Sequence, residues 1–75
     1  MKDSDLTRMA NQIAENFAAW PEEEAIENTK GHIRSFWDPR MRKQIIDYVA
    51  NGGADLHPTA KTAIERLREA ESAKS

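Results

Sequence analysis

The sequence contains no cysteine among its 75 residues. A chain without thiols forms no disulfide, supplies no thiolate ligand to zinc or to an iron–sulfur cluster, and has no cysteine nucleophile. No apolar run reaches 10 residues, whereas a transmembrane helix needs about 20. The first residues, MKDSDL, place acids where a signal peptide has a basic end followed by an apolar stretch. These absences predict a cytoplasmic chain with no membrane span.

The sequence also lacks an internal repeat, a low-complexity linker and the alternation typical of strands. With 39% hydrophobic and 32% charged residues, its composition fits one domain over residues 1–75, ordered over about 4–70 with a frayed C-terminal tail. A chain of this size hides only about 60% of its unfolded surface. We therefore expect a folding margin of a few kcal/mol, to which docking on a partner would add.

Near the N-terminus, apolar residues recur at intervals of three and four, the spacing of one helix face. We expect a helix that is capped by Asp3, Ser4 or Asp5 and reaches Ala19, because Pro21 disfavours helical geometry in the residue before it. The apolar stripe consists of Leu6, Met9, Ile13, Phe17 and Trp20.

A second helix is predicted to start at Pro21, because proline suits the first turn and the following glutamates at 22–24 favour the positive end of the helix dipole. Gly31 lies within this helix, where we expect a bend or a close helix crossing. The inward face consists of Ile26, Thr29 or Lys30, Ile33, and Phe36 or Trp37.

A third helix has clear boundary signals: Asp38 as the cap, Pro39 in the first position, and Gly52 or Gly53 for a left-handed stop. A fourth begins near Pro58, and the tail from residue 69 is expected to fray. Their core positions are Met41, Ile45, Tyr48 and Val49, then Ala60, Ala63, Ile64 and Leu67. The prediction is an all-α fold, a compact bundle of four short helices.

Candidates for catalysis and metal binding are weak. His32 and His57 have no carboxylate or histidine at helical spacing, so we interpret them as surface or capping residues. Glu23 and Glu27 share a helix face, but a solvated helix start explains them better than a carboxylate metal site. We therefore expect no catalytic, cofactor-binding or metal-binding residue in this chain.

Charge is distributed unevenly along the chain. Residues 1–29 contain two basic and seven acidic residues, whereas residues 30–43 contain five basic and one acidic. The basic block surrounds the pair Phe36 and Trp37, and a combination of aromatic residues with arginine is typical of interface anchors. The predicted partner-binding residues are Arg34, Trp37, Arg40, Arg42, Lys43 and Ile46, and the structural motif residues are Phe36, Asp38, Pro39 and Met41.

An alternative reading of this block is purely structural. Neighbours on a helix point about 100° apart, so we expect Phe36 to face the core and leave Trp37 divided between core and interface. The arginines would then pair on the surface with acids such as Glu22, Glu23, Glu27 or Asp47. A patch of this kind also supports weak self-association of the isolated chain.

Three segments, LTRMANQIAENFAAWPEEEA, HIRSFWDPRMRKQI and VANGGADLHPTAKTAIERLR, occur in this order over about residues 6–68. In this pattern the chain resembles the small delta subunit of cytoplasmic NAD-dependent formate dehydrogenase. The resemblance implies an accessory subunit of a molybdenum- or tungsten-containing enzyme that oxidises formate to carbon dioxide and reduces NAD⁺. The molybdopterin, iron–sulfur clusters and flavin are then expected in partner subunits, with none in this chain.

Three hypotheses about function remain at this point. The first is docking on the large catalytic subunit to support assembly, stability or cofactor insertion. The second is a transient assembly chaperone that leaves the mature enzyme. The third is a small helical nucleic-acid binder that uses Arg40, Arg42 and Lys43 on phosphates, which the overall net charge of −2 disfavours.

Overall fold

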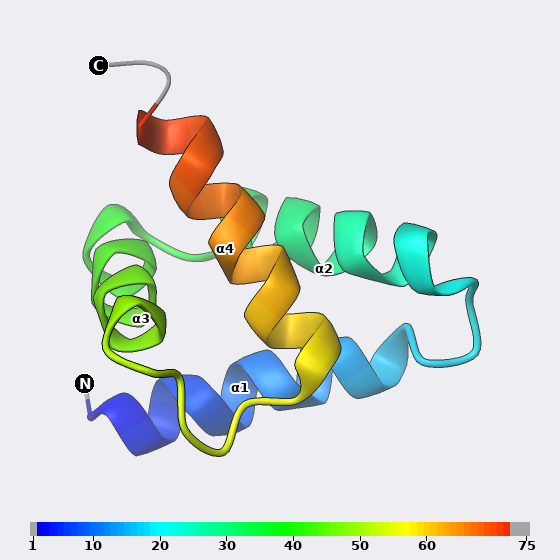
Figure 1. The fold of residues 1–75 in the computed structure, drawn as a ribbon, viewed down its shortest axis with the longest axis horizontal. Coiled ribbons are helices and arrows are strands. Elements are labelled where there is room, and N and C mark those ends of the chain that lie inside the picture. Colours follow the sequence, from blue (N-terminus) through cyan, green and yellow to red (C-terminus); the bar gives the residue numbers. More distant parts are fainter. Residues whose placement is uncertain (1, 73–75) are drawn as a thin grey trace.

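The structure, a computed structural model, describes residues 2–72 and contains four helices over that range and no strand. Helices α1 and α2 run in roughly opposite directions, and α4 crosses both of them (Figure 1). Helix α3 packs against α4 and α1. The predicted all-α bundle is confirmed. The bounds are α1 Asp3–Asn16, α2 Glu22–Phe36, α3 Pro39–Ala50 and α4 Pro58–Ser72.

Helix α1 buries Leu6 and Ile13 of the expected stripe, whereas Met9 and Phe17 are half-buried and Trp20 is exposed. The helix also differs from the prediction at both ends. Lys2 occupies the cap position and no side chain accepts a hydrogen bond there, so the predicted carboxylate or serine cap is wrong. The helix stops at Asn16, with Phe17 as its C-cap, and not at Ala19. Residues 17–21 form the turn itself, in which the Trp20 amide donates to the Phe17 carbonyl at 3.0 Å.

Helix α2 runs unbroken through Gly31. A Cβ atom added at Gly31 would meet nothing within 4 Å, so the predicted close helix crossing is wrong. The buried face of α2 packs mainly against α4. One polar group lies on that face, the fully buried Thr29 hydroxyl, which donates to the Ala25 carbonyl at 2.7 Å.

The boundaries of α3 are as predicted. The Asp38 carboxylate accepts a hydrogen bond from the Met41 amide at 3.0 Å, and Pro39 fills the first position. At the other end, Gly52 and Gly53 adopt φ values of 122° and 61°. The Gly53 amide donates to the Tyr48 carbonyl at 3.0 Å and so satisfies one of the last acceptors of the helix.

Helix α4 starts beside a histidine cap. The His57 Nδ1 atom accepts from the Thr59 amide at 3.1 Å, which confirms the expectation of a surface or capping histidine. The Asn11 side chain holds the preceding loop, since its Oδ1 accepts from the His57 amide at 2.7 Å and its Nδ2 donates to the Asp55 carbonyl at 2.8 Å. Residues 69–72 are helical, so the predicted fraying is wrong there, and residues 73–75 lie outside the described residues.

The core gathers side chains from all four helices and from Trp37, which lies between α2 and α3. Among the described residues, two large hydrophobic side chains remain outside it, Trp20 and Phe36, with exposed fractions of 50% and 75%. Within residues 2–72, no helix combines the length and the apolarity that crossing a membrane requires. The two exposed aromatics lie at the two ends of α2, Trp20 just before its start and Phe36 at its last residue.

Candidate partner-binding site

The junction of α2 and α3 is set by local sequence. Helix α2 ends at Phe36, and Trp37 adopts extended geometry with φ −89° and ψ 141°. Pro39 favours such extended geometry in the residue before it, and Asp38 accordingly has ψ 164° before α3 begins. The chain thus turns over two residues, so that the end of α2 and the start of α3 are adjacent (Figure 1).

The two adjacent aromatics point in opposite directions. Trp37 is only 5% exposed and belongs to the same core cluster as Ile33 and Ile45. Phe36 is exposed and stacks on His32 with the ring centroids 4.6 Å apart. The prediction that Phe36 faces the core is therefore wrong, and the question left open for Trp37 is resolved in favour of the core. Trp37 lies four residues after the buried Ile33, and its amide still donates to the Ile33 carbonyl at 3.0 Å, so its side chain continues the buried face of α2.

Arg42 is occupied within the fold. Its Nη1 atom donates to the carbonyls of Trp37 at 2.7 Å and Arg34 at 3.4 Å, at the C-terminal end of α2. Its Nε atom lies 3.9 Å from a carboxylate oxygen of Glu71 on α4. A cation is favoured at a helix C-terminus because the last carbonyls lack partners. Arg42 therefore connects α2 to α3 and α4. Its guanidinium is engaged within the fold, whereas the sequence analysis predicted it to bind a partner.

Of the other basic residues of the segment 30–43, Lys30 is half-buried and pairs with Glu27 at 3.0 Å, and three are exposed. Arg34, Arg40 and Lys43 form no ion pair among residues 2–72 that the structure describes, so the predicted pairing with nearby acids is not found for them. We call the exposed side chains of Arg34, Phe36, Arg40 and Lys43, at the end of α2 and the start of α3, the basic corner.

A groove adjoins the basic corner between α3 and α4. It encloses about 510 Å³. Ile46, which is half-buried, and Pro39 supply its apolar part, while Lys43 and Arg68 bring two cations to its rim. The lining residues are Pro39, Lys43, Ile46, Arg68, Glu71 and Ser72. Sequence analysis missed Arg68, because only the folded chain brings α4 next to the start of α3.

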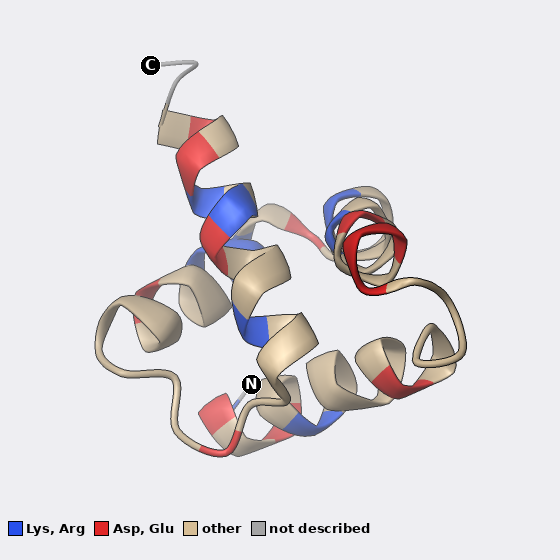
Figure 2. Cartoon of the chain, turned by 45° about the vertical axis from the view of Figure 1, so that its right-hand side comes forward, with Lys and Arg blue, Asp and Glu red and all other residues tan. Residues whose placement is uncertain are grey.

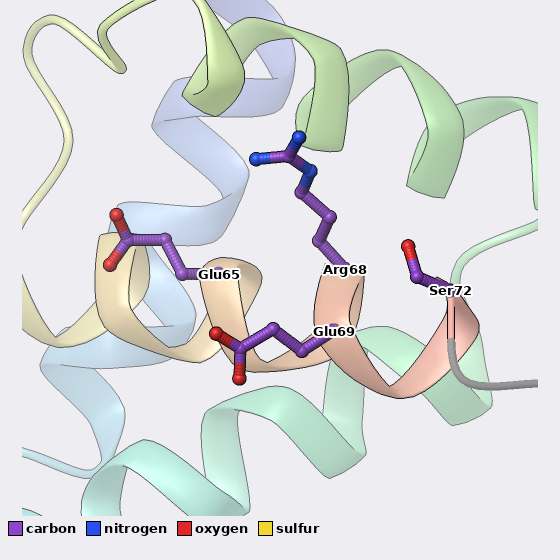
Figure 3. A pocket seen from close by; sticks show the side chains of 4 residues that line it. All are labelled: Glu65, Arg68, Glu69 and Ser72. Atoms are coloured by element: carbon purple, nitrogen blue, oxygen red, sulfur yellow. The ribbon is translucent and has the colours of Figure 1, made fainter.

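A second hollow, of about 700 Å³, lies along α4 and is lined by polar side chains. Figure 3 shows Arg68 reaching from α4 toward α3, whereas Glu65 and Glu69 extend to another side of the helix. The fourth lining residue is Ser72 at the end of α4. Arg68 lines both hollows together with Glu65, Glu69 and Glu71, so the surface of α4 beside the corner carries charges of both signs.

The two glutamates that share a face of α2 are held by an arginine that the sequence did not identify. Arg66 on α4 donates from Nη2 to Glu23 at 2.9 Å and from Nη1 to Glu27 at 2.8 Å, with a further bond from Nη1 to Glu23. These hydrogen bonds lower the pKa of both carboxyls, helped at Glu27 by Lys30, and raise the pKa of Arg66. Two carboxylates four residues apart are a signal for such a clamp, but its cation lies 39 residues further along the chain.

The geometry of the basic corner favours binding of another macromolecule. An exposed aromatic ring with arginine and lysine around it is the composition of interface anchors. The corner is also ordered before contact, because Asp38 caps α3 and Arg42 fixes the end of α2. A surface held in this way loses little conformational freedom on binding.

Comparison with known proteins gave one informative result. The model of a protein family described as NADH-dependant formate dehydrogenase delta subunit FdsD matches residues 5–64. No curated protein and no solved structure matches the chain. The matched region includes α1, α2, α3 and the first half of α4, and with them every residue of the basic corner.

Proposed function

The chain belongs to the family of the delta subunits of NADH-dependent formate dehydrogenase, and from this premise we propose that it is a non-catalytic subunit that docks on the large catalytic subunit. In that role it supports assembly, stability or cofactor insertion, while the molybdopterin, iron–sulfur clusters and flavin are held by the partner subunits. Family membership supports association with the enzyme complex. We assign the docking surface to the basic corner.

The observation that carries this proposal is the exposed Phe36 at the junction of α2 and α3, close in sequence to three exposed cations that form no ion pair among residues 2–72. A phenyl ring that is 75% exposed is costly in a free protein, because its apolar surface remains in water. Coverage by a partner recovers that free energy, and the surrounding Arg34, Arg40 and Lys43 select an acidic surface around the ring. We therefore expect the catalytic subunit to present an apolar socket with carboxylates at its rim.

The composition of the chain supports docking over nucleic-acid binding. The nucleic-acid hypothesis assigns phosphate contacts to Arg40, Arg42 and Lys43. Of these, Arg42 is bound to backbone carbonyls and to Glu71. Residues 1–29 carry seven acids against two bases, so this part of the molecule would repel a phosphate backbone. The basic corner is small enough to suit one acidic protein patch.

The test is co-purification of tagged chain with the other subunits of the enzyme, all expressed together. Phe36→Ala with Arg40→Glu removes the ring and reverses one charge, and we expect recovery of the catalytic subunit to fall about tenfold or more, as for loss of an interface anchor. Arg8→Glu is the matched control, because Arg8 is an exposed arginine on α1 far from the corner in sequence. Unchanged recovery with the double variant would contradict the proposed surface.

The same preparation separates a permanent subunit from an assembly factor. Formate-dependent NAD⁺ reduction in the purified complex supports a subunit that is retained in the mature enzyme. Recovery of only an inactive, cofactor-free catalytic subunit supports the alternative of a transient chaperone. In either case the basic corner is the expected contact.

A further inference from the structure

The other exposed aromatic, Trp20, lies in the turn between α1 and α2. Its indole is half exposed and packs edge-on against Phe17, with the ring centroids 6.1 Å apart. The neighbouring Ala18, Ala19 and Pro21 are exposed as well. The turn therefore presents a continuous apolar surface that the core does not use.

The charges beside this turn are negative. Glu22 and Glu24 are exposed in the first turn of α2 and form no ion pair among the residues the structure describes, since Arg66 binds Glu23 and Glu27 instead. No lysine or arginine occurs between Arg8 and Lys30. We call the surface formed by Trp20, Glu22 and Glu24 the acidic end.

The acidic end and the basic corner lie at opposite ends of α2. This helix has 15 residues, which corresponds to about 22 Å at 1.5 Å per residue. In Figure 2 the first turn of α2 is red, and the blue of lysine and arginine lies toward its other end and where α3 begins. Each end carries one exposed aromatic ring. Three exposed cations and one acid, Asp38, lie near Phe36 in the sequence, whereas Glu22 and Glu24 lie near Trp20, so the net charges of the two ends are opposite.

We propose that in the isolated chain the basic corner of one copy binds the acidic end of a second copy, head to tail. The complementary charges align the two surfaces, and each contact covers one Trp20 and one Phe36. Because the two surfaces differ, the contact is heterologous, and every added copy leaves one free surface of each kind. The association is thus open, growing with concentration until a ring closes.

This proposal does not depend on the proposed function, because both surfaces are present in the isolated chain. The two proposals share the basic corner, however, so the catalytic subunit and a second copy would compete for it. Self-association would then cover Phe36 until the catalytic subunit is available. The acidic end would stay free in the complex.

The test uses two variants, each with one blocked surface, analysed by sedimentation velocity at low salt. Trp20→Ala with Glu24→Lys blocks the acidic end, and Phe36→Ala with Arg40→Glu blocks the basic corner. We expect the wild-type sedimentation coefficient to rise with protein concentration and each variant alone to stay monomeric. An equimolar mixture of the two should form a dimer that does not grow, because only one intact pair of surfaces remains.

Matched controls place the same charge changes elsewhere. Glu65→Lys and Arg8→Glu alter exposed residues on α4 and α1, outside both surfaces, and should associate as the wild type does. High salt should weaken the wild-type association and the mixed dimer alike, since both depend on exposed charges. Far-ultraviolet circular dichroism establishes that each variant is folded.

Three results would overturn the proposal. A wild-type chain that stays monomeric at low salt and high concentration has no such contact. Folded variants that associate like the wild type would assign the contact to other surfaces. Failure of the mixture to form a dimer, although the wild type associates, would mean that the contact is symmetric. None of these results bears on capture of the catalytic subunit, which is measured separately.

Discussion

Phe36 and Trp37 show how two adjacent aromatic side chains can take different roles. The ring of Phe36 lies in water, whereas Trp37, four residues after the buried Ile33, places its indole in the core. The indole is therefore available for stability, and the phenyl ring for contacts with other molecules. The two roles are separable by single substitutions.

Trp37→Ala should lower the free energy of unfolding by about 3–5 kcal/mol, as expected for removal of a buried aromatic side chain. Phe36→Ala should change it by only about 0.5 kcal/mol, because its ring is exposed. With a total margin of a few kcal/mol for a chain of this size, the first variant should lose most of its helical circular dichroism. Urea unfolding of the second variant provides the comparison, and similar losses in both would contradict the assignment.

The Arg66 clamp predicts a dependence of stability on pH. The folded pKa values of Glu23 and Glu27 lie below the ordinary value of 4.5, so the unfolded chain binds more protons as the medium becomes acidic. The stabilisation is therefore complete above pH 4.5 and is lost as the pH falls through the lowered values. Because all three side chains reach solvent, we expect the effect to be small.

Arg66→Gln removes the clamp and is the variant that tests this dependence. Its stability should be below that of the wild type near neutral pH, and the difference should shrink in acid, once both glutamates are protonated. Urea unfolding across the pH range measures it. Arg68→Gln is the control, because Arg68 lies on the same helix as Arg66 but forms no ion pair among the described residues. A difference that stays constant into acid would assign the loss to packing instead.

At the scale of the elements, helix starts and stops were predicted best where the backbone signal was strong. Asp38, Pro39 and the glycine pair specify α3 through capping and torsion preferences, which act within a few residues. The end of α1 was missed by three residues, from Ala19 to Asn16, because the turn into α2 needs its own residues before Pro21. The spacing of apolar residues does not indicate how many residues the following turn needs.

Two glycines in different elements should respond oppositely to the same substitution. Gly31→Ala should raise the free energy of unfolding by about 0.5–1 kcal/mol, because alanine is the better helix former and its Cβ meets no atom within 4 Å. Gly53→Ala should lower it by about 1–2 kcal/mol, because φ is +61° there. Thermal and urea unfolding of both variants check this pair, and a destabilising Gly31→Ala would indicate a contact at that face.

At the scale of the whole molecule, the bundle followed from the sequence but the binding surface followed only in part. Apolar periodicity and caps depend on neighbours in the chain, so the four helices could be predicted. The partners of the charged residues could not be predicted, because they are distant in the sequence. Arg66 and Glu27 lie 39 residues apart, and Arg68 reaches α3 only in the folded chain. Arg34, Arg40 and Lys43 were predicted and are exposed, whereas Arg42 is engaged within the fold.

The most direct measurement of the central claim is site-specific crosslinking within the assembled enzyme. A photoreactive phenylalanine analogue is placed at position 36, and its reaction partner is identified by mass spectrometry. We predict crosslinks from position 36 to an acidic surface of the large catalytic subunit, with the same analogue at exposed position 8 giving none there. Absence of such crosslinks from position 36 in an intact complex that contains this chain would contradict docking through the basic corner.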